Sequence, residues 1–129
     1  MQDHLTDIFA YRNDLERDLA DVIEADPYES TRPFTTADGD EYETPAAWLE
    51  GFALSCEIWD RRPEVPGEGY SGHIVEWLLG CGGPTIRLTY DTRWNNGTLM
   101  HSWGAGGRTR IEVRGVLCEW LAEWFGVTA

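Results

Sequence analysis

The sequence predicts a single α+β domain over residues 1–129, with two N-terminal helices, a three-stranded antiparallel sheet and a C-terminal helix packed on the sheet. Three patterns support this: helical periodicity at both ends of the chain, apolar residues alternating with polar ones in its middle, and turn residues between the alternating runs. A chain of 129 residues, of which 42% are hydrophobic, can bury one core without metal or disulfide help.

The first helix is predicted over residues 3–25. At about 100° per residue, one arc of its surface is apolar and should meet the core; it holds Leu5, Ile8, Leu15, Leu19, Val22 and Ile23. A second stripe, roughly 27 Å long, carries the carboxylates of Asp3, Asp7, Asp14, Asp18 and Asp21. Asp26-Pro27 should end the helix, because the residue before a proline avoids the helical conformation.

Residues 27–44 are polar and predict a long loop, with room for one short strand around Phe34. The loop holds a second acidic cluster, formed by Asp38, Asp40, Glu41 and Glu43. Thr44-Pro45 is typical of an N-cap followed by proline at the first helical position, and predicts a second helix over residues 45–61. Its inward residues would be Trp48, Leu49, Phe52, Cys56 and Trp59.

The three-stranded sheet is predicted within residues 71–103. An apolar run over 74–79 ends at a glycine-rich turn, and Ile86, Leu88 and Tyr90 then alternate with polar residues. Asn95-Asn96-Gly97 supplies a second turn, and Leu99 to Trp103 forms the third strand.

The C-terminal helix is predicted to start in the segment Thr109-Arg110-Ile111-Glu112, which matches a capping box. It would run to about Phe125, with Gly126 as its stop. The pattern leaves one alternative open, in which residues 109–113 form a fourth strand.

Charge is the most informative property of the chain. The 23 acidic residues against 10 basic ones give a net charge of −13, which repels nucleic acid and anionic membranes and attracts basic surfaces. The charge is asymmetric: residues 1–64 hold 17 acidic and five basic side chains, and residues 65–129 hold six and five. Every basic residue is arginine, which indicates GC-rich coding or, alternatively, a salt-adapted proteome.

The acidic stripe has two interpretations. It is what the solvated face of any amphipathic helix shows, or it replaces a phosphate backbone. Its carboxylates recur every 5 to 10 Å or so along the helix, and arginine binds carboxylate and phosphate with the same forked geometry. On the second interpretation the chain competes with nucleic acid for a basic channel and does not bind nucleic acid itself.

In its size, its net charge of −13 and its acidic first helix, the chain resembles the small anti-CRISPR and anti-restriction proteins that phages and mobile elements use against bacterial defence. Residues 81–87, followed by a hairpin and Trp103-Gly104, are similar to a pattern in uncharacterised phage and plasmid proteins. The resemblance implies a non-enzymatic inhibitor of a basic, nucleic-acid-binding complex. Some members of this class cover a protein surface without resembling DNA.

The predicted contact residues follow from the charge and from one turn. Trp94 lies beside Arg93 in the predicted hairpin, where an exposed aromatic side chain suits a protein contact. Such an aromatic patch is the basis of an alternative function, a general interaction module. The full set is Asp3, Asp7, Asp14, Asp18, Asp21, Asp38, Asp40, Glu41, Glu43 and Trp94.

Catalytic and metal sites are weaker hypotheses. Cys81 with His73 or His101 as base and Asp91 as orienting group would make a small Cys/His enzyme, the third candidate function. The same Cys81, His73 and His101 lack the paired spacing of a zinc site, so no metal or cofactor is expected.

The sequence also predicts the compartment. Three cysteines without CxxC spacing argue against a disulfide framework, and no signal peptide or membrane-spanning window is present. We therefore expect a cytoplasmic protein of a bacterial host cell.

Overall fold

The computed structural model describes residues 4–60, 72–81, 85–102 and 107–126. These residues form three helices and seven strands. In chain order the elements are α1 (His4–Ala25), β1 (Phe34–Thr35), β2 (Glu41–Tyr42), α2 (Pro45–Glu50), β3 (Ser55–Asp60), β4 (His73–Gly80), β5 (Thr85–Asp91), β6 (Asn96–Ser102), β7 (Arg108–Val113) and α3 (Gly115–Trp124).

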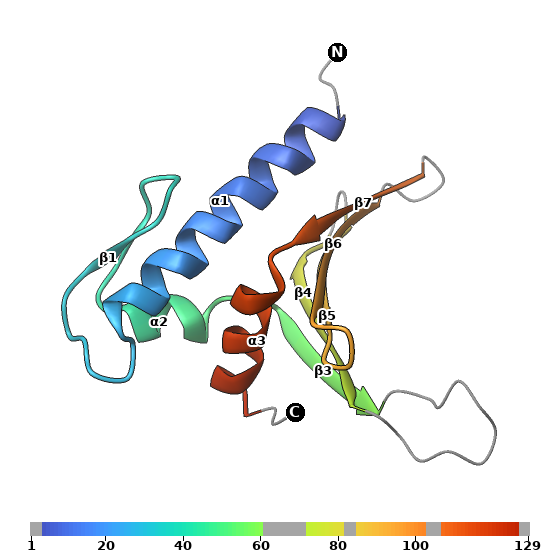
Figure 1. Cartoon of the computed structure of the whole chain (residues 1–129). Coiled ribbons are helices and arrows are strands. Elements are labelled where there is room, and N and C mark those ends of the chain that lie inside the picture. Colours follow the sequence, from blue (N-terminus) through green and yellow to red (C-terminus); the bar gives the residue numbers. More distant parts are fainter. Residues whose placement is uncertain (1–3, 61–71, 82–84, 103–106, 127–129) are drawn as a thin grey trace.

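Strands β3 to β7 form one antiparallel sheet in which neighbours follow chain order, and β1 and β2 form a separate two-stranded sheet. The helices lie on one side of the larger, curved sheet (Figure 1), where α3 packs against β5 and β6 and α1 packs against β7 and α3. The α+β class is therefore confirmed. The finer prediction, a three-stranded sheet with two N-terminal helices, is wrong because the sheet has five strands and the second helix is a short segment.

The core lies on the face of the sheet that the helices cover. Its centre is Trp77 of β4, which is fully buried and lies directly across from Leu88 of β5. Phe52 and Phe125 meet the Trp77 ring in edge-on geometry, with ring centroids at 6.4 and 6.0 Å. Such pairs add to the free energy of burial, so Trp77 joins the segment after α2 to the end of α3.

Helix α1 agrees with its sequence prediction. Its buried residues, Ile8, Leu15, Leu19 and Val22, recur at helical spacing and pack in the core. The helix ends at Ala25, and Asp26 follows with φ of 55°. Within the described residues, no helix is both long enough and apolar enough to cross a bilayer.

The second predicted helix, residues 45–61, is corrected by the structure. Its start is right, because the side chain of Thr44 accepts a hydrogen bond from Ala47 N at 3.1 Å. The helix ends at Glu50, and residues 55–60 form β3, which pairs with β4. Over a segment as short as residues 55–60, the spacing of apolar residues fits a helix and a strand almost equally well. The strand forms because it pairs with β4 and so satisfies backbone N–H and C=O groups of β4 that would otherwise lack partners.

The capping box at Thr109 is also corrected, and the alternative of a further strand is confirmed. Residues 108–113 form β7, in which Thr109 lies opposite His101 and Ile111 opposite Leu99. The last helix starts at Gly115, and Arg114 N donates to Glu16 Oε2 of α1 at 2.8 Å. A strand forms here in place of the predicted helix start because it places Ile111 and Val113 on the face of the sheet that the helices cover.

Two turns differ in detail from their predictions. Residues 92–95 make the β5–β6 turn, with Asn95 at φ of 52°, so Asn96 and Gly97 already belong to β6. Within residues 27–44 the expected strand around Phe34 is β1, and it forms a short hairpin with a second strand, β2, which the sequence did not predict. Trp103, the predicted end of the third strand, lies outside the described residues.

Gly97, near the start of β6, provides a test of this packing. A Cβ atom at Gly97 would lie 2.6 Å from Cys118 Sγ and 2.7 Å from Val113 O. We expect Gly97→Ala to lower the free energy of unfolding by roughly 1–3 kcal/mol in urea denaturation, because α3 cannot retreat from the sheet without losing core contacts.

Gly80→Ala is the matched control, since the nearest atom to its added Cβ would be Ile86 Cδ1 at 3.9 Å. It should change stability by less than about 0.5 kcal/mol. Equal losses in the two variants would contradict the close approach of α3 to β6.

Candidate functional site

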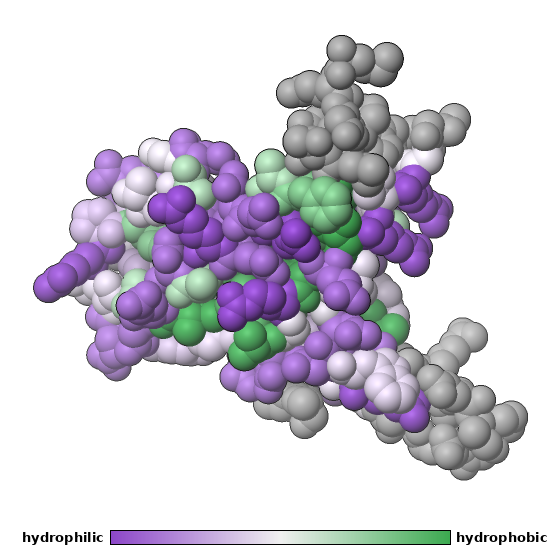
Figure 2. All heavy atoms as spheres, turned by 45° about the horizontal axis from the view of Figure 1, so that its top comes forward, coloured by the Kyte–Doolittle hydropathy of each residue, from purple (hydrophilic) through white to green (hydrophobic). Residues whose placement is uncertain are grey.

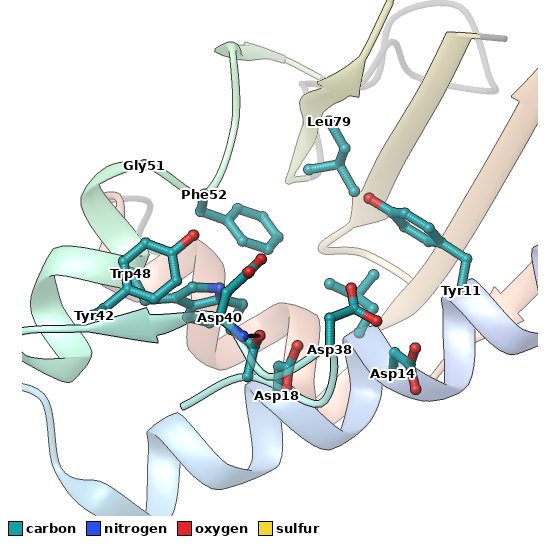
Figure 3. A pocket seen from close by; sticks show the side chains of 12 residues that line it. Tyr11, Asp14, Asp18, Asp38, Asp40, Tyr42, Trp48, Gly51, Phe52 and Leu79 are labelled. Atoms are coloured by element: carbon teal, nitrogen blue, oxygen red, sulfur yellow. Dashed lines mark hydrogen bonds between the residues drawn. The ribbon is translucent and has the colours of Figure 1, made fainter. Parts of the chain in front are cut away.

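A cavity of about 190 Å³ lies where α1, the β1–β2 hairpin and α2 meet. Figure 3 shows four carboxylates and several aromatic rings that surround it. The lining residues are Tyr11, Asp14, Leu15, Asp18, Thr36, Asp38, Asp40, Tyr42, Trp48, Gly51, Phe52 and Leu79. We call this cavity the acidic pocket.

Two of the carboxylates are fixed by α1 and two by the hairpin. Asp14 and Asp18 lie one helical turn apart on α1 and therefore share a face. The connection between β1 and β2 is tied by Thr36 N donating to Asp40 O at 2.8 Å and by Asp40 N donating to Thr36 Oγ1 at 3.1 Å. This compact turn holds Asp38 and Asp40 on the side that faces the helix (Figure 3).

Asp18 joins the two halves of the pocket. Its side chain is buried, with 9% exposed, and its Oδ1 accepts a hydrogen bond from Ala37 N at 2.8 Å. Burial raises the pKa of Asp18; the Ala37 hydrogen bond opposes this shift, and the charges of Asp14, Asp21 and Asp38 add to it. Asp18 therefore contributes to the shape of the pocket as well as to its charge.

Aromatic rings form the opposite wall. Trp48 packs against Phe34 and Phe52, with both centroid distances at 5.4 Å, so the wall is anchored in the core. Tyr11 lies on the α1 side of the pocket, with Asp14 and Asp18; burial, with a smaller effect from the Asp38 charge, raises the pKa of Tyr11, so its phenol stays protonated at neutral pH. Aromatic faces attract cations, as carboxylates do.

The charged side chains that line the pocket are all acidic. Its described lining contains no arginine or histidine, and no described residue pairs with the carboxylates of Asp14, Asp38 or Asp40. Like charges held this close repel one another, and a cation between them would relieve the repulsion. The pocket therefore suits a guanidinium or ammonium group.

The predicted contact residues fall into three groups. The structure brings Asp14, Asp18, Asp38 and Asp40 together at the pocket, as just described. Asp21, Glu41 and Glu43 are exposed nearby but do not line it. Asp3 and the side chain of Asp7 lie outside the described residues.

Trp94 occupies a separate position, the β5–β6 turn. It is 53% exposed, and the Arg93 guanidinium carbon lies 4.8 Å from the centroid of its ring. It does not line the acidic pocket.

The aromatic and apolar side chains that line the pocket are the part of the site that sequence reasoning missed. Tyr11 carried a usable signal, because it precedes Asp14 by three positions and Asp18 by seven and so shares their helical face. Tyr42, Phe52 and Leu79 carried none, since only the tertiary fold brings β2, the end of α2 and β4 to the same cavity.

The Cys/His hypothesis meets a geometric obstacle. His73 begins β4 and Cys81 follows its last residue, which separates them by roughly 25 Å at about 3.3 Å per residue. Asp91 pairs with Ile74 at the His73 end, and His101 is buried at the other end, opposite Ile86. Among the described residues, no group of three or more His, Cys, Asp or Glu side chains could hold a metal ion.

Comparison with protein-family models, curated proteins and solved structures finds no match to this chain. A functional assignment therefore depends on the geometry and the electrostatics of the site itself.

The burial of Asp18 predicts a pH-dependent stability difference. Because the pKa of Asp18 is raised in the folded state, the stability that its neutral form contributes is fully present below its ordinary pKa of 3.8 and is lost as the pH rises through the folded value. We expect Asp18→Asn, which keeps an acceptor for Ala37 N, to be more stable than the parent at pH 7. The difference should vanish below pH 3.8 in chemical denaturation followed across pH.

Glu24→Gln on the exposed side of α1 measures the general effect of one fewer negative charge. A loss of stability in Asp18→Asn at pH 7 would contradict the account, because it would mean that the ionised carboxylate stabilises the fold.

Proposed function

We propose that this protein is a non-enzymatic inhibitor of a bacterial nucleic-acid-binding defence complex, of the anti-CRISPR or anti-restriction type. Its acidic face competes with DNA for a basic channel of that complex. One observation carries the proposal: four carboxylates, from α1 and from the β1–β2 hairpin, converge on an aromatic-walled pocket whose described lining holds no basic residue.

The acidic pocket gives this competition a physical basis. A nucleic-acid channel presents arginine and lysine side chains that neutralise phosphates. An arginine from the channel would form forked hydrogen bonds with the carboxylates and would stack on the aromatic wall. The same arginine could not then bind a phosphate, so the inhibitor and DNA would exclude each other.

The polar surface of the molecule and the charge of the first half of the chain support a broad contact. Hydrophilic residues predominate on the face shown in Figure 2, and hydrophobic atoms are visible between them. The acidic excess lies in residues 1–64, which supply α1 and the hairpin, with 17 acidic against five basic side chains. Long-range attraction would guide a basic partner to this half of the molecule.

Partner capture tests the proposal directly. The immobilised protein is exposed to lysate of a GC-rich bacterium at low salt, and bound proteins are eluted with rising salt or with duplex DNA and identified by mass spectrometry. We expect a nucleic-acid-binding complex that both salt and DNA release. A specific partner that resists both eluents would refute competition with DNA.

Substitutions then locate the contact. The triple variant Asp14→Asn, Asp38→Asn, Asp40→Asn removes the outer charges of the pocket and leaves Asp18 in place. We expect affinity for the captured partner to fall roughly tenfold or more, with a weaker dependence on salt, because charge-assisted contacts are lost. Binding is measured by calorimetry at two or more salt concentrations.

The matched control removes three exposed carboxylates elsewhere, Glu29→Gln, Glu119→Gln and Glu123→Gln. It removes the same number of negative charges, so it should weaken binding much less if the pocket is the contact. Equal losses in the two triple variants would show that overall charge, and not the pocket, accounts for binding.

The exposed turn supports the second candidate, a general interaction module that uses an aromatic patch. Trp94 is 53% exposed, and its ring stacks with the guanidinium of Arg93 at a strand turn. Tryptophan and arginine dominate the energetics of many protein interfaces.

The two candidates differ in the effect of Trp94→Ala. If the aromatic turn is the contact, we expect this variant to weaken partner binding by roughly 2 kcal/mol or more, while the pocket variant binds normally. If the acidic pocket is the contact, Trp94→Ala retains most of the parent affinity. The far-UV circular dichroism of both variants, compared with the parent, checks that folding is intact.

A further inference from the structure

The two edges of the five-stranded sheet differ in chemical character. Strand β3 forms one edge and pairs only with β4 among the described strands. Three large apolar side chains at this edge are exposed: Leu54 by 64%, Ile58 by 47% and Trp59 by 42%. Ile58 lies across from Val75 and Trp59 across from Ile74, so apolar groups protrude on both faces of the sheet.

Strand β7, at the other edge, is protected. Its exposed residues Arg108, Arg110 and Glu112 alternate along the strand, and α1 packs against it. Arg12 of α1 donates from Nη1 to Glu112 O at 3.0 Å. Charged side chains and a covering helix are the usual means of preventing strand addition at an edge. Among the described residues no helix packs closely against β3, and its charged residues, Glu57 and Asp60, are both acidic.

We propose that β3 receives an extended segment of a basic partner protein as an added antiparallel strand, with a lysine or arginine of that segment opposite Glu57. Backbone hydrogen bonds would supply affinity, and side-chain pairs across the new ladder would supply specificity. The inference shares with the proposed function only the basic character of the partner, because β3 does not line the acidic pocket.

Charge selects the occupant. Glu57 is exposed and lies directly across the ladder from Glu76, a like-charge pair that is unfavourable on its own. Glu76 is already paired with Arg87 Nε at 3.2 Å, and no described residue is paired with Glu57. A cation on an added strand would lie opposite Glu57 on the same face, and an apolar residue next to it would face Ile58.

A second copy of this chain fits the edge less well. Residues 55–60, Ser-Cys-Glu-Ile-Trp-Asp, contain no basic residue. Symmetric pairing of two β3 strands within residues 55–60 would place Glu57 opposite Ser55, another Glu57 or Trp59, since residues that pair must share a face. None of these three arrangements supplies the missing cation.

Hydrogen exchange with a synthetic peptide tests the inference. The probe is a short, end-blocked peptide in which lysine and valine alternate, and the comparison peptide carries glutamate in place of lysine. We expect the lysine peptide to slow exchange of the amides of residues 55–60 and the glutamate peptide to leave them unchanged. A lysine peptide with proline at alternate positions should not protect them either, because it cannot complete the ladder.

A matched pair of variants separates this edge from the general attraction of an acidic protein for lysine. Glu57→Lys should weaken lysine-peptide binding roughly five-fold or more, because like charges would then lie opposite each other. Glu112→Lys makes the same charge change on the same face of the sheet, at the β7 edge, and should have a clearly smaller effect. Equal losses would overturn the inference.

Two further outcomes would also overturn it. Protection confined to α1 and the hairpin would place the peptide at the acidic pocket, and protection of residues 55–60 that grows with protein concentration in the absence of peptide would identify a second copy as the occupant. In the triple variant Asp14→Asn, Asp38→Asn, Asp40→Asn, protection of β3 by the lysine peptide should persist. If the lysine peptide no longer protected residues 55–60 in this variant, while β3 itself remained folded, the pocket would be the binding site of the peptide.

Discussion

The structure depends on burying one face of a five-stranded sheet around Trp77. This side chain is fully buried between Phe52 and Phe125, and its indole N–H has no hydrogen-bond partner within the described residues, so packing alone holds it. Covering this face requires both long helices, because α3 spans only β5 and β6 and α1 packs against β7 and α3. Because Leu15, Leu19 and Val22 of α1 pack in the core, Asp14 and Asp18 lie on the side of the helix that faces the β1–β2 hairpin, where Asp18 is buried.

That orientation produces the acidic pocket. Asp14 and Asp18 project from α1 toward the β1–β2 hairpin, and the bond from Ala37 N to Asp18 Oδ1 fixes the hairpin against the helix. Burial of the Asp18 carboxylate near other carboxylates opposes folding, and this cost is reflected in the raised pKa of Asp18. The fold is therefore less stable than it would be with a neutral side chain at this position. Departures of this kind concentrate at functional sites, which is consistent with the proposed recognition of a cationic partner.

Elements with a strong local signal were predictable from the sequence, and the two edge strands of the sheet were not. Helix α1, the Thr44 cap and strands β4 to β6 follow from periodicity, alternation and capping chemistry. The sequence of β3 fits a helical stripe through Phe52, Cys56 and Trp59, and that of β7 fits a capping box at Thr109 and Glu112, with a strand as the alternative left open there. In both cases the segment forms a strand because it pairs with a neighbouring strand, β4 for β3 and β6 for β7. Such pairing between distant segments cannot be read from a single sequence. The acidic residues of the site were predictable from charge; the aromatic wall around them required the fold.

The most direct test of the acidic pocket is hydrogen exchange of this protein, measured with and without the captured partner. If the pocket is the contact, the partner slows exchange in residues 11–18 of α1 and in residues 36–42 of the hairpin, and added duplex DNA reverses the effect. Protection limited to the turn at residues 92–95, unaffected by DNA, would contradict the account and would identify Trp94 as the centre of the interface.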